Sequence, residues 1–298
     1  MNAGRSDLRG ILLAVSGFTF WVFADTSIKI VGASRLPGYE IIAFLGVFVS
    51  AAVAAYAGAR GEFARLRPHK VTHQAVRSSL DLGNNLCVVV ALRHVSLPLF
   101  YILVFLAPLV ITVLAGMFLK EKIGTGKAIA VVAGFAGVIV AVNPFGSSRQ
   151  GDWIGFGACM VCVACFSINM VWSRVLTRTE TAESLTFFSG LVMALAGFGA
   201  MVWRAEPLDG RLLVALLAMG LFCAIGSISF FVALKHTTAS NVSQYHYTQL
   251  LTGSAVSYLI WRQLPTLSMM AGGALIIGAG LYVALRGARV LPDQEARG

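Results

Sequence analysis

The chain has 298 residues, of which 57% are hydrophobic and only 12% are charged, about half the charged fraction of a typical soluble domain. With a mean hydropathy of +0.80, this composition excludes a soluble globular protein and a disordered chain, and it indicates a polytopic membrane protein. A net charge of +10 would favour nucleic-acid binding in a soluble domain, but here it fits basic cytoplasmic loops, so we expect no nucleic-acid partner. Five cysteines cannot all pair, and they predict no disulfide framework.

Ten apolar segments are long enough to form membrane-spanning helices. Their predicted ranges are 11–31, 39–57, 75–92, 99–119, 128–142, 153–172, 182–203, 212–234, 242–261 and 267–285. Spans of about 20 residues each occupy most of the chain and leave no room for a soluble catalytic domain. The first span is too long for a signal peptide and is not followed by a cleavage site of small residues. The predicted fold class is therefore all-α, with ten transmembrane helices.

The distribution of basic residues predicts the orientation in the membrane. Sixteen of the 23 Lys and Arg residues, with Arg77 among them, fall on the N-terminal side of the ten spans, and seven fall on the opposite side. Basic residues are enriched in cytoplasmic loops. We therefore expect an inner (plasma) membrane protein with both termini in the cytoplasm.

The sequence resembles itself across its midpoint. Three pairs of short segments match at offsets of 145, 142 and 143 residues: 7–10 with 152–155, 90–94 with 232–236, and 136–141 with 279–284. The match divides the chain into a first repeat at 8–143, a second repeat at 152–286 and a cytoplasmic tail at 287–298. Each repeat holds five spans, an odd number, so the two repeats insert in opposite orientations. Inverted repeats of this kind are typical of secondary transporters, whose substrate sites lie near the membrane midplane between the repeats.

Two sets of motifs make the sequence similar to a known superfamily. The first set is Ala-Leu-Arg-His at 91–94 and Ala-Leu-Lys-His at 233–236. The second is Leu-Ala-Pro at 106–108 followed by Leu-Lys-Glu-Lys-Ile at 119–123, where Lys120 replaces the glycine of the superfamily's Leu-Gly-Glu motif. The chain resembles the drug/metabolite transporter superfamily, with two EamA domains, and within it the aromatic amino-acid exporters of the YddG type. The resemblance implies export of small molecules by alternating access.

Polar side chains in the first and third spans are candidates for a substrate site, because such groups are costly in lipid. In the first span, Trp21 and Asp25 share a helix face, and Lys29 lies one further turn along. Either Lys29 reaches the interface and Asp25 only neutralises it, or Asp25 lines the pathway. In the third span, Asp81 is either interfacial or part of the pathway, and Asn85 lies deeper.

The fourth, sixth and eighth spans add further candidates. Tyr101 and Phe105 in the fourth span are either core residues or substrate contacts, and Pro108 bends the helix at a cavity or a moving element. In the sixth span we expect Asn169 to contact substrate, and Trp172 either does so or belongs to an interfacial aromatic belt. The repeat pairs Asn85 with Ser227 in the eighth span.

The ninth span has an unusually polar start at 241–249. The repeat pairs Ser243 with Tyr101 and Tyr247 with Phe105, which predicts an inward face containing Ser243, His246 and Tyr247. His246 titrates near neutral pH, so it is either a packing residue or a proton relay.

These residues together predict a cavity with aromatic walls, a few amides and hydroxyls, and a sparse pair of opposite charges. Such a lining fits a zwitterion with an apolar or aromatic side chain, and the predicted partner is an amino acid or similar small molecule. Transport is either uncoupled (uniport) or coupled to exchange of a proton that binds Asp25, Asp81 or His246. Spans one, three, four, six, eight and nine would line the cavity, and spans five and ten would brace it.

We expect no cofactor and no metal site. The three cysteines at 159, 162 and 165 lack obvious partners for a zinc tetrahedron, and the sequence at 122–127 lacks essential parts of a phosphate-binding loop. Export of other metabolites or cationic drugs is the alternative substrate class. A channel and an intramembrane enzyme are less favoured, because neither a filter sequence nor a nucleophile motif is present. The sequence does not determine the oligomeric state.

Overall fold

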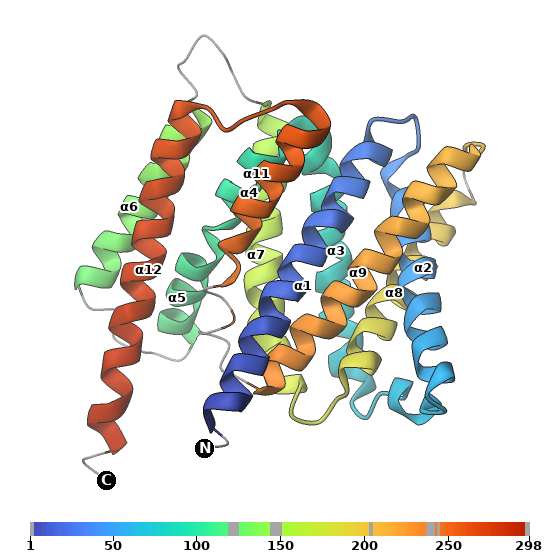
Figure 1. Ribbon diagram of the computed structural model, residues 1–298, viewed down its shortest axis with the longest axis horizontal. Helices are drawn as coiled ribbons and strands as arrows, with labels where there is room; N and C mark the ends of the chain where they lie inside the picture. Colours follow the sequence, from blue (N-terminus) through green and yellow to red (C-terminus); the bar gives the residue numbers. More distant parts are fainter. Residues whose placement is uncertain are drawn as a thin grey trace.

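The structure is a computed structural model that describes residues 3–118, 125–143, 151–202, 205–236, 242 and 245–295, and these residues form helices and short connections (Figure 1). The helices in chain order are α1 (Ala3–Gly32), α2 (Gly38–Ala59), the short 3₁₀ helix η1 (Phe63–Leu66), α3 (Val71–His94), α4 (Leu97–Val104), α5 (Ala107–Phe118), α6 (Thr125–Val142), α7 (Trp153–Leu176), α8 (Ala182–Met201), α9 (Gly210–His236), α11 (Thr248–Trp261) and α12 (Leu267–Glu295).

Among the described residues, five helices are long and apolar enough to cross a membrane, and they lie in α1, α2, α7, α8 and α9. Shorter apolar helices occur at Leu97–Ile111, Ala128–Val142 and Leu267–Val283. Large apolar side chains on the outside of the bundle, such as Val132, Leu195 and Val214, are about two-thirds exposed. Such a surface is stable in lipid rather than in water.

The two halves of the chain interlock rather than standing side by side. The most extensive contacts join α1 with α9, α2 with α8, α3 with α7 and α6 with α12, so each pair takes one helix from each half. The pair of α1 and α9 corresponds, under the repeat, to the pair of α7 and α3. Figure 1 shows α6 and α12 side by side at one edge, away from the other pairs. The site is therefore built among the remaining helices.

The crossing of α2 and α8 depends on two glycines. A Cβ at Gly46 would lie 2.4 Å from the carbonyl oxygen of Gly190, and one at Gly190 would lie 2.9 Å from that of Gly46. Because neither residue has a side chain, the two backbones come into direct contact. This contact lies at equivalent positions of the two halves and holds them together.

Two predicted spans are interrupted, at positions that the repeat makes equivalent. The fourth span is two helices, because Phe105 and Leu106 form a turn between α4 and α5, directly before Ala107 and Pro108. In the ninth span, His246 and Tyr247 form a turn directly before α11. The break in the fourth span lies next to Pro108, the residue at which we predicted a bend, and the turn in the ninth span lies inside its predicted range. Interrupted helices at matching positions of two halves are a feature of transporter binding sites.

The beginning of α1 and the end of α12 lie at the same end of the bundle (Figure 1). The segment 287–295, which we predicted as a tail, continues α12 to Glu295.

Candidate functional site: a central cavity between the two halves

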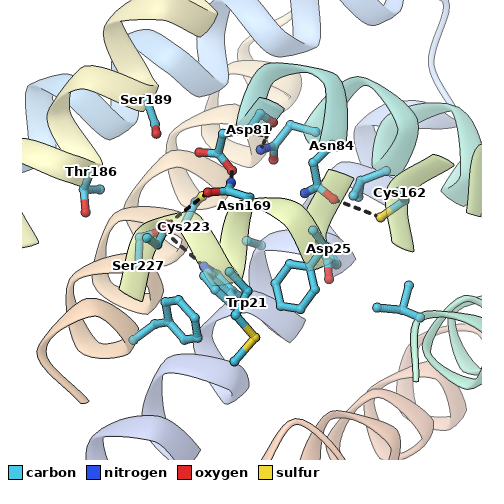
Figure 2. Close-up of a pocket in the computed structure, with 18 of the residues that line it drawn as sticks. Trp21, Asp25, Asp81, Asn84, Cys162, Asn169, Thr186, Ser189, Cys223 and Ser227 are labelled. Atoms are coloured by element: carbon cyan, nitrogen blue, oxygen red, sulfur yellow. Dashed lines mark hydrogen bonds between the residues drawn. The ribbon is translucent and has the colours of Figure 1, made fainter. Parts of the chain in front are cut away.

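A cavity of about 110 Å³ lies inside the bundle, lined by residues of α1, α2, α3, α4, α7, α8, α9, α11 and His246 (Figure 2). Spans one, three, four, six, eight and nine line it, as predicted. Val49 of α2 and three residues of α8 also line it, which the sequence did not predict. Both halves therefore contribute to one site.

Eight of the predicted candidates line this cavity. They are Trp21, Asp25, Asp81, Asn85, Tyr101, Asn169, Ser227 and His246.

The remaining candidates lie elsewhere. Phe105 and Tyr247 do not line the cavity; their rings pack edge-to-face, with centroids 5.1 Å apart. Trp172 also lies outside it, with its ring edge-on to that of His73. Pro108 lines a smaller pocket, which also contacts His246. Ser243 lies outside the described residues.

Asp25 interacts with Tyr101 and not with Lys29. The Tyr101 hydroxyl donates a hydrogen bond of 2.8 Å to Oδ2 of Asp25. Lys29 instead donates to the carbonyl oxygens of Leu92 and Val95, at 2.9 and 2.8 Å, at the end of α3. The interpretation that Asp25 neutralises Lys29 is therefore wrong. Lys29 instead turns toward carbonyl oxygens at a helix C-terminus, which attract a cation. Asp25 forms no ion pair with the residues that the structure describes.

Aromatic rings form much of the wall beside Asp25. The indole nitrogen of Trp21 donates to the Ser227 hydroxyl at 3.2 Å, which joins α1 of the first half to α9 of the second (Figure 2). The ring of Phe230 lies 4.9 Å from that of Trp21. His246 is enclosed by aromatic rings, with Phe18 stacked on it at 4.9 Å. Its side chain is 4% exposed.

A network of amides and acids lies across the cavity from these rings. Asn169 donates to Oδ1 of Asp81 at 3.1 Å and accepts from the Ser173 hydroxyl at 3.0 Å. Asn85 donates to the backbone carbonyl of Asp81, one turn earlier in α3, at 2.9 Å. The bond from Asn169 to Asp81 ties α7 to α3, and the other two bonds lie within one helix each (Figure 2).

Arg77 is a cavity residue that sequence reasoning missed. We counted it among the basic residues of the cytoplasmic side, but α3 already begins at Val71, and Arg77 is only 1% exposed. Its guanidinium donates to the carbonyl oxygen of Leu185 at 2.8 Å and to the hydroxyl of Ser189. The cavity therefore holds a basic side chain that the predicted lining did not include.

Other missed residues are neutral and polar. Asn84 accepts from the Cys162 thiol at 3.1 Å, and Gln249 donates to the carbonyl oxygen of Phe18 at 3.2 Å. Thr186 and Ser189 line the cavity from α8. Their spacing of three residues on an apolar span is the signal that could have revealed them.

At the end of the bundle that holds Ala3, the two halves are joined by acidic side chains that precede and begin α8. The buried carboxylate of Glu180 accepts from the backbone amides of His69 and Lys70, at 2.9 and 2.7 Å. Glu183 forms an ion pair of 3.0 Å with Arg65. These contacts dock the α2–α3 connection of the first half on the α7–α8 connection of the second.

At the opposite end, acidic residues again join the halves. Oε1 of the buried Glu40 accepts from the backbone amide of Glu206 at 2.7 Å. Oδ2 of Asp152 lies 2.6 Å from Nδ1 of His94, while Oδ1 caps α7 by accepting from the Gly155 amide. The hydrogen bond from Gly155, and then the contact with His94, hold the pKa of Asp152 below its ordinary value. Polar contacts therefore close both ends of the bundle.

Comparison with known proteins identifies the family. The sequence profile of the EamA-like transporter family matches residues 8–143 and 153–285. The chain belongs to this family. It is therefore a multi-pass membrane transporter of the drug/metabolite superfamily with two EamA units, and small-molecule transport is its class of function.

Individual relatives are distant. The chain is 24% identical to the pseudopaline exporter CntI of Pseudomonas aeruginosa over 273 residues, which are 91% of this chain and 94% of the exporter. It is 24% identical to an S-adenosylmethionine uptake transporter of Rickettsia bellii over 184 residues, which are 60% of each chain. It is 23% identical to a riboflavin transporter of Brucella anthropi over 201 residues, which are 65% of this chain and 69% of the transporter. A solved crystal structure shares the fold with a TM-score of 0.68 at 17% identity, over 94% of this chain and 98% of its own.

Proposed function

We propose that the protein is a secondary transporter that exports small zwitterionic metabolites, amino acids and aromatic amino acids among them, by alternating access between its two halves. The observation that supports this most directly is the cavity, which is lined from both halves and lies between two ends joined by polar contacts. Rocking of one half against the other would break the contacts at one end while keeping those at the other. Export as the direction rests on the resemblance to amino-acid exporters and on the exporter among the relatives.

We further propose ten membrane spans, with both termini in the cytoplasm of a cell whose inner membrane holds the protein. Five long apolar helices and three shorter ones support eight of these spans. The other two are α3, whose polar residues face the cavity, and α11 with the turn that precedes it. The excess of basic residues on the N-terminal side supports the orientation.

The cavity favours a substrate with an amine. Asp25 is a carboxylate without a paired cation among the described residues, and Trp21, Tyr101 and Phe230 present their rings nearby. An ammonium group is stabilised both by a carboxylate and by the faces of aromatic rings. The substrates that the relatives' names give differ from one another, so the amino-acid part of the proposal rests on this lining.

Proton coupling is the second part of the mechanism that needs a test. Asp25, Asp81 and His246 all line the cavity, but the His246 ring is packed among aromatic rings, so the two carboxylates are the better candidates for exchanging a proton with substrate. Imposing a pH gradient on proteoliposomes tests this: stimulated transport would support proton exchange, and transport that is indifferent to the gradient would support uniport.

The decisive experiment is counterflow of labelled phenylalanine into proteoliposomes preloaded with unlabelled amino acids. We expect saturable accumulation by the wild type and a large loss in Asn85→Ala, which removes an amide from the cavity. Leu86→Ala is the matched control, because Leu86 is the next residue of α3 and does not line the cavity. Absence of counterflow with every amino acid would refute the proposed substrate class.

A second candidate substrate is an organic cation without a carboxylate, as in the cationic-drug alternative. The unpaired Asp25 favours it, and the two classes differ in whether a carboxylate is needed for binding. A cationic amide of an amino acid separates them, as described below.

A further inference from the structure

We propose that Arg77, together with Ser189 and Asn169, forms an anion-binding subsite that holds the carboxylate of the substrate at the end of the cavity nearer the chain termini. The inference rests on the proposed function and specifies which residue recognises which part of the zwitterion.

The environment of Arg77 is incomplete without an anion. Its guanidinium donates to three neutral acceptors, which are the carbonyl oxygen of Leu185, the hydroxyl of Ser189 and, at 3.5 Å, the amide oxygen of Asn169. It also lies over the ring of Phe231, 5.3 Å from the centroid. Its Nε is buried and has no hydrogen-bond partner among the described residues. A guanidinium has five N–H groups, and burial of a cation without a paired anion is costly.

The acid closest along the helix does not form an ion pair with Arg77. Asp81 lies one turn further in α3, and its Oδ1 is bonded to the side-chain amide of Asn169. Arg77 forms no ion pair with any carboxylate among the described residues, yet it lines the cavity. A planar carboxylate of the substrate supplies the missing acceptor, because it matches the forked geometry of a guanidinium.

Arg77 and Asp25 lie at different levels of the cavity. Two contacts between α3 and α7 define these levels. At one level Arg77 of α3 donates to Asn169 of α7, and at the other the Cys162 thiol of α7 donates to Asn84 of α3. Seven residues separate the two contacts on each helix. At 1.5 Å per residue this is about 10 Å. Figure 2 draws Asp25 toward the side of the view that holds Asn84 and Cys162, away from Ser189, which places it toward the second level.

Asp25 and Arg77 therefore present a carboxylate and a guanidinium to the same cavity. Each of the two opposite charges of an amino acid can face one of them, with charge-assisted hydrogen bonds of about 2.8 Å. The ammonium then lies at Asp25 and Tyr101, the carboxylate at Arg77 and Ser189, and the apolar side chain against the aromatic wall.

The test compares phenylalanine with phenylalaninamide, which keeps the amine and the ring but lacks the carboxylate. We expect the wild type in proteoliposomes to bind phenylalanine about 30-fold more tightly than the amide, as judged from half-saturation of counterflow. In Arg77→Met this ratio should fall to near one. Arg93→Met is the matched control: Arg93 lies on the same helix and donates to the backbone carbonyl of Leu36, but it does not line the cavity.

A purely structural role for Arg77 predicts a different result. Loss of packing would weaken both ligands equally and leave the ratio unchanged, and that outcome would overturn the proposal. If Arg77→Met does not yield a monodisperse protein, Arg77→Lys and Ser189→Ala replace it. Arg77→Lys keeps the positive charge but removes the forked guanidinium, and Ser189→Ala keeps Arg77 but removes a hydroxyl that accepts from it. The ratio should therefore fall partway in each variant, and an unchanged ratio in both would also overturn the proposal. A wild type that shows no counterflow with any amino acid would refute the proposed function, and this inference with it.

Discussion

Replacing Gly46 by alanine tests whether direct backbone contact between α2 and α8 holds the two halves together. The added Cβ would lie 2.3 Å from the backbone nitrogen of Ala194 and 2.4 Å from the carbonyl oxygen of Gly190. Both neighbours are backbone atoms of α8, so neither can move without the helix. Because optimal contacts lie near 3.5 Å, the two helices must separate by about 1 Å.

The expected cost follows from two opposing effects. Overpacking a close contact costs about 1–3 kcal/mol, and a gap of this size also forfeits a quarter to a half of the dispersion energy of the atom pairs that it separates. Alanine gains about 1 kcal/mol over glycine in a helix interior. We therefore expect Gly46→Ala to lower the free energy of unfolding by about 1–2 kcal/mol net.

The assay is thermal unfolding of the purified protein in detergent, at two heating rates because unfolding of such proteins is often irreversible. We expect the midpoint to fall by about 2–8 °C. Gly157→Ala is the matched control, because a Cβ at Gly157 of α7 meets nothing within 4 Å, and it should show a small rise. An equal rise for both variants would refute the reasoning, because it would mean that helix propensity outweighs the contact.

Three further changes test the ends of the bundle and the cavity. Glu180→Ala leaves two backbone amides without their acceptor and should lower the free energy of unfolding by about 1–3 kcal/mol. Glu62→Ala is the control, because the ion pairs of Glu62 are exposed, and it should lower that free energy by less than about 0.5 kcal/mol. Equal losses of stability would contradict the assigned role of Glu180. Because the pKa of Asp152 is depressed, its contribution to stability is present above the unfolded-state pKa and is lost as the pH falls through the folded-state pKa. The unfolding temperatures of the wild type and Asp152→Asn should therefore differ near neutral pH and converge in acid, and a gap that does not depend on pH would count against this contact. Tyr101→Phe removes the donor to Asp25, so we expect a changed pH profile of counterflow; an unchanged profile would argue against Asp25 as the coupling residue.

Prediction from the sequence worked best for local properties. Runs of apolar residues predicted the helices, and polar residues within those runs predicted part of the cavity lining, because a polar group in lipid is costly wherever the helix packs. Trp21, Asp25 and Asn169 were found in this way, and Ser227 was found through the repeat. The same argument applied to α8 would have found Thr186 and Ser189.

Prediction failed where a side chain had a choice of partners. Lys29 lies one turn from Asp25 in the chain, yet it donates to carbonyl oxygens at the end of α3. Arg77 lies near the start of a helix, where the sequence favours the interface, yet contacts with α7 and α8 bury it. The repeat aligns Tyr247 with Phe105 and predicts that both face the cavity, but their rings pack on each other beside the helix breaks instead.

By itself, the sequence determined that the chain is an all-helical membrane protein built from two related halves, because hydropathy and internal repeats are properties of the chain order alone. Only the tertiary structure decided which faces of those helices meet. The rotation of each helix about its axis depends on close contacts such as that of Gly46 with Gly190, which involve residues far apart in the chain. That rotation turned Arg77 into the cavity and Lys29 away from it, so the charges that a substrate meets were set by packing between the halves.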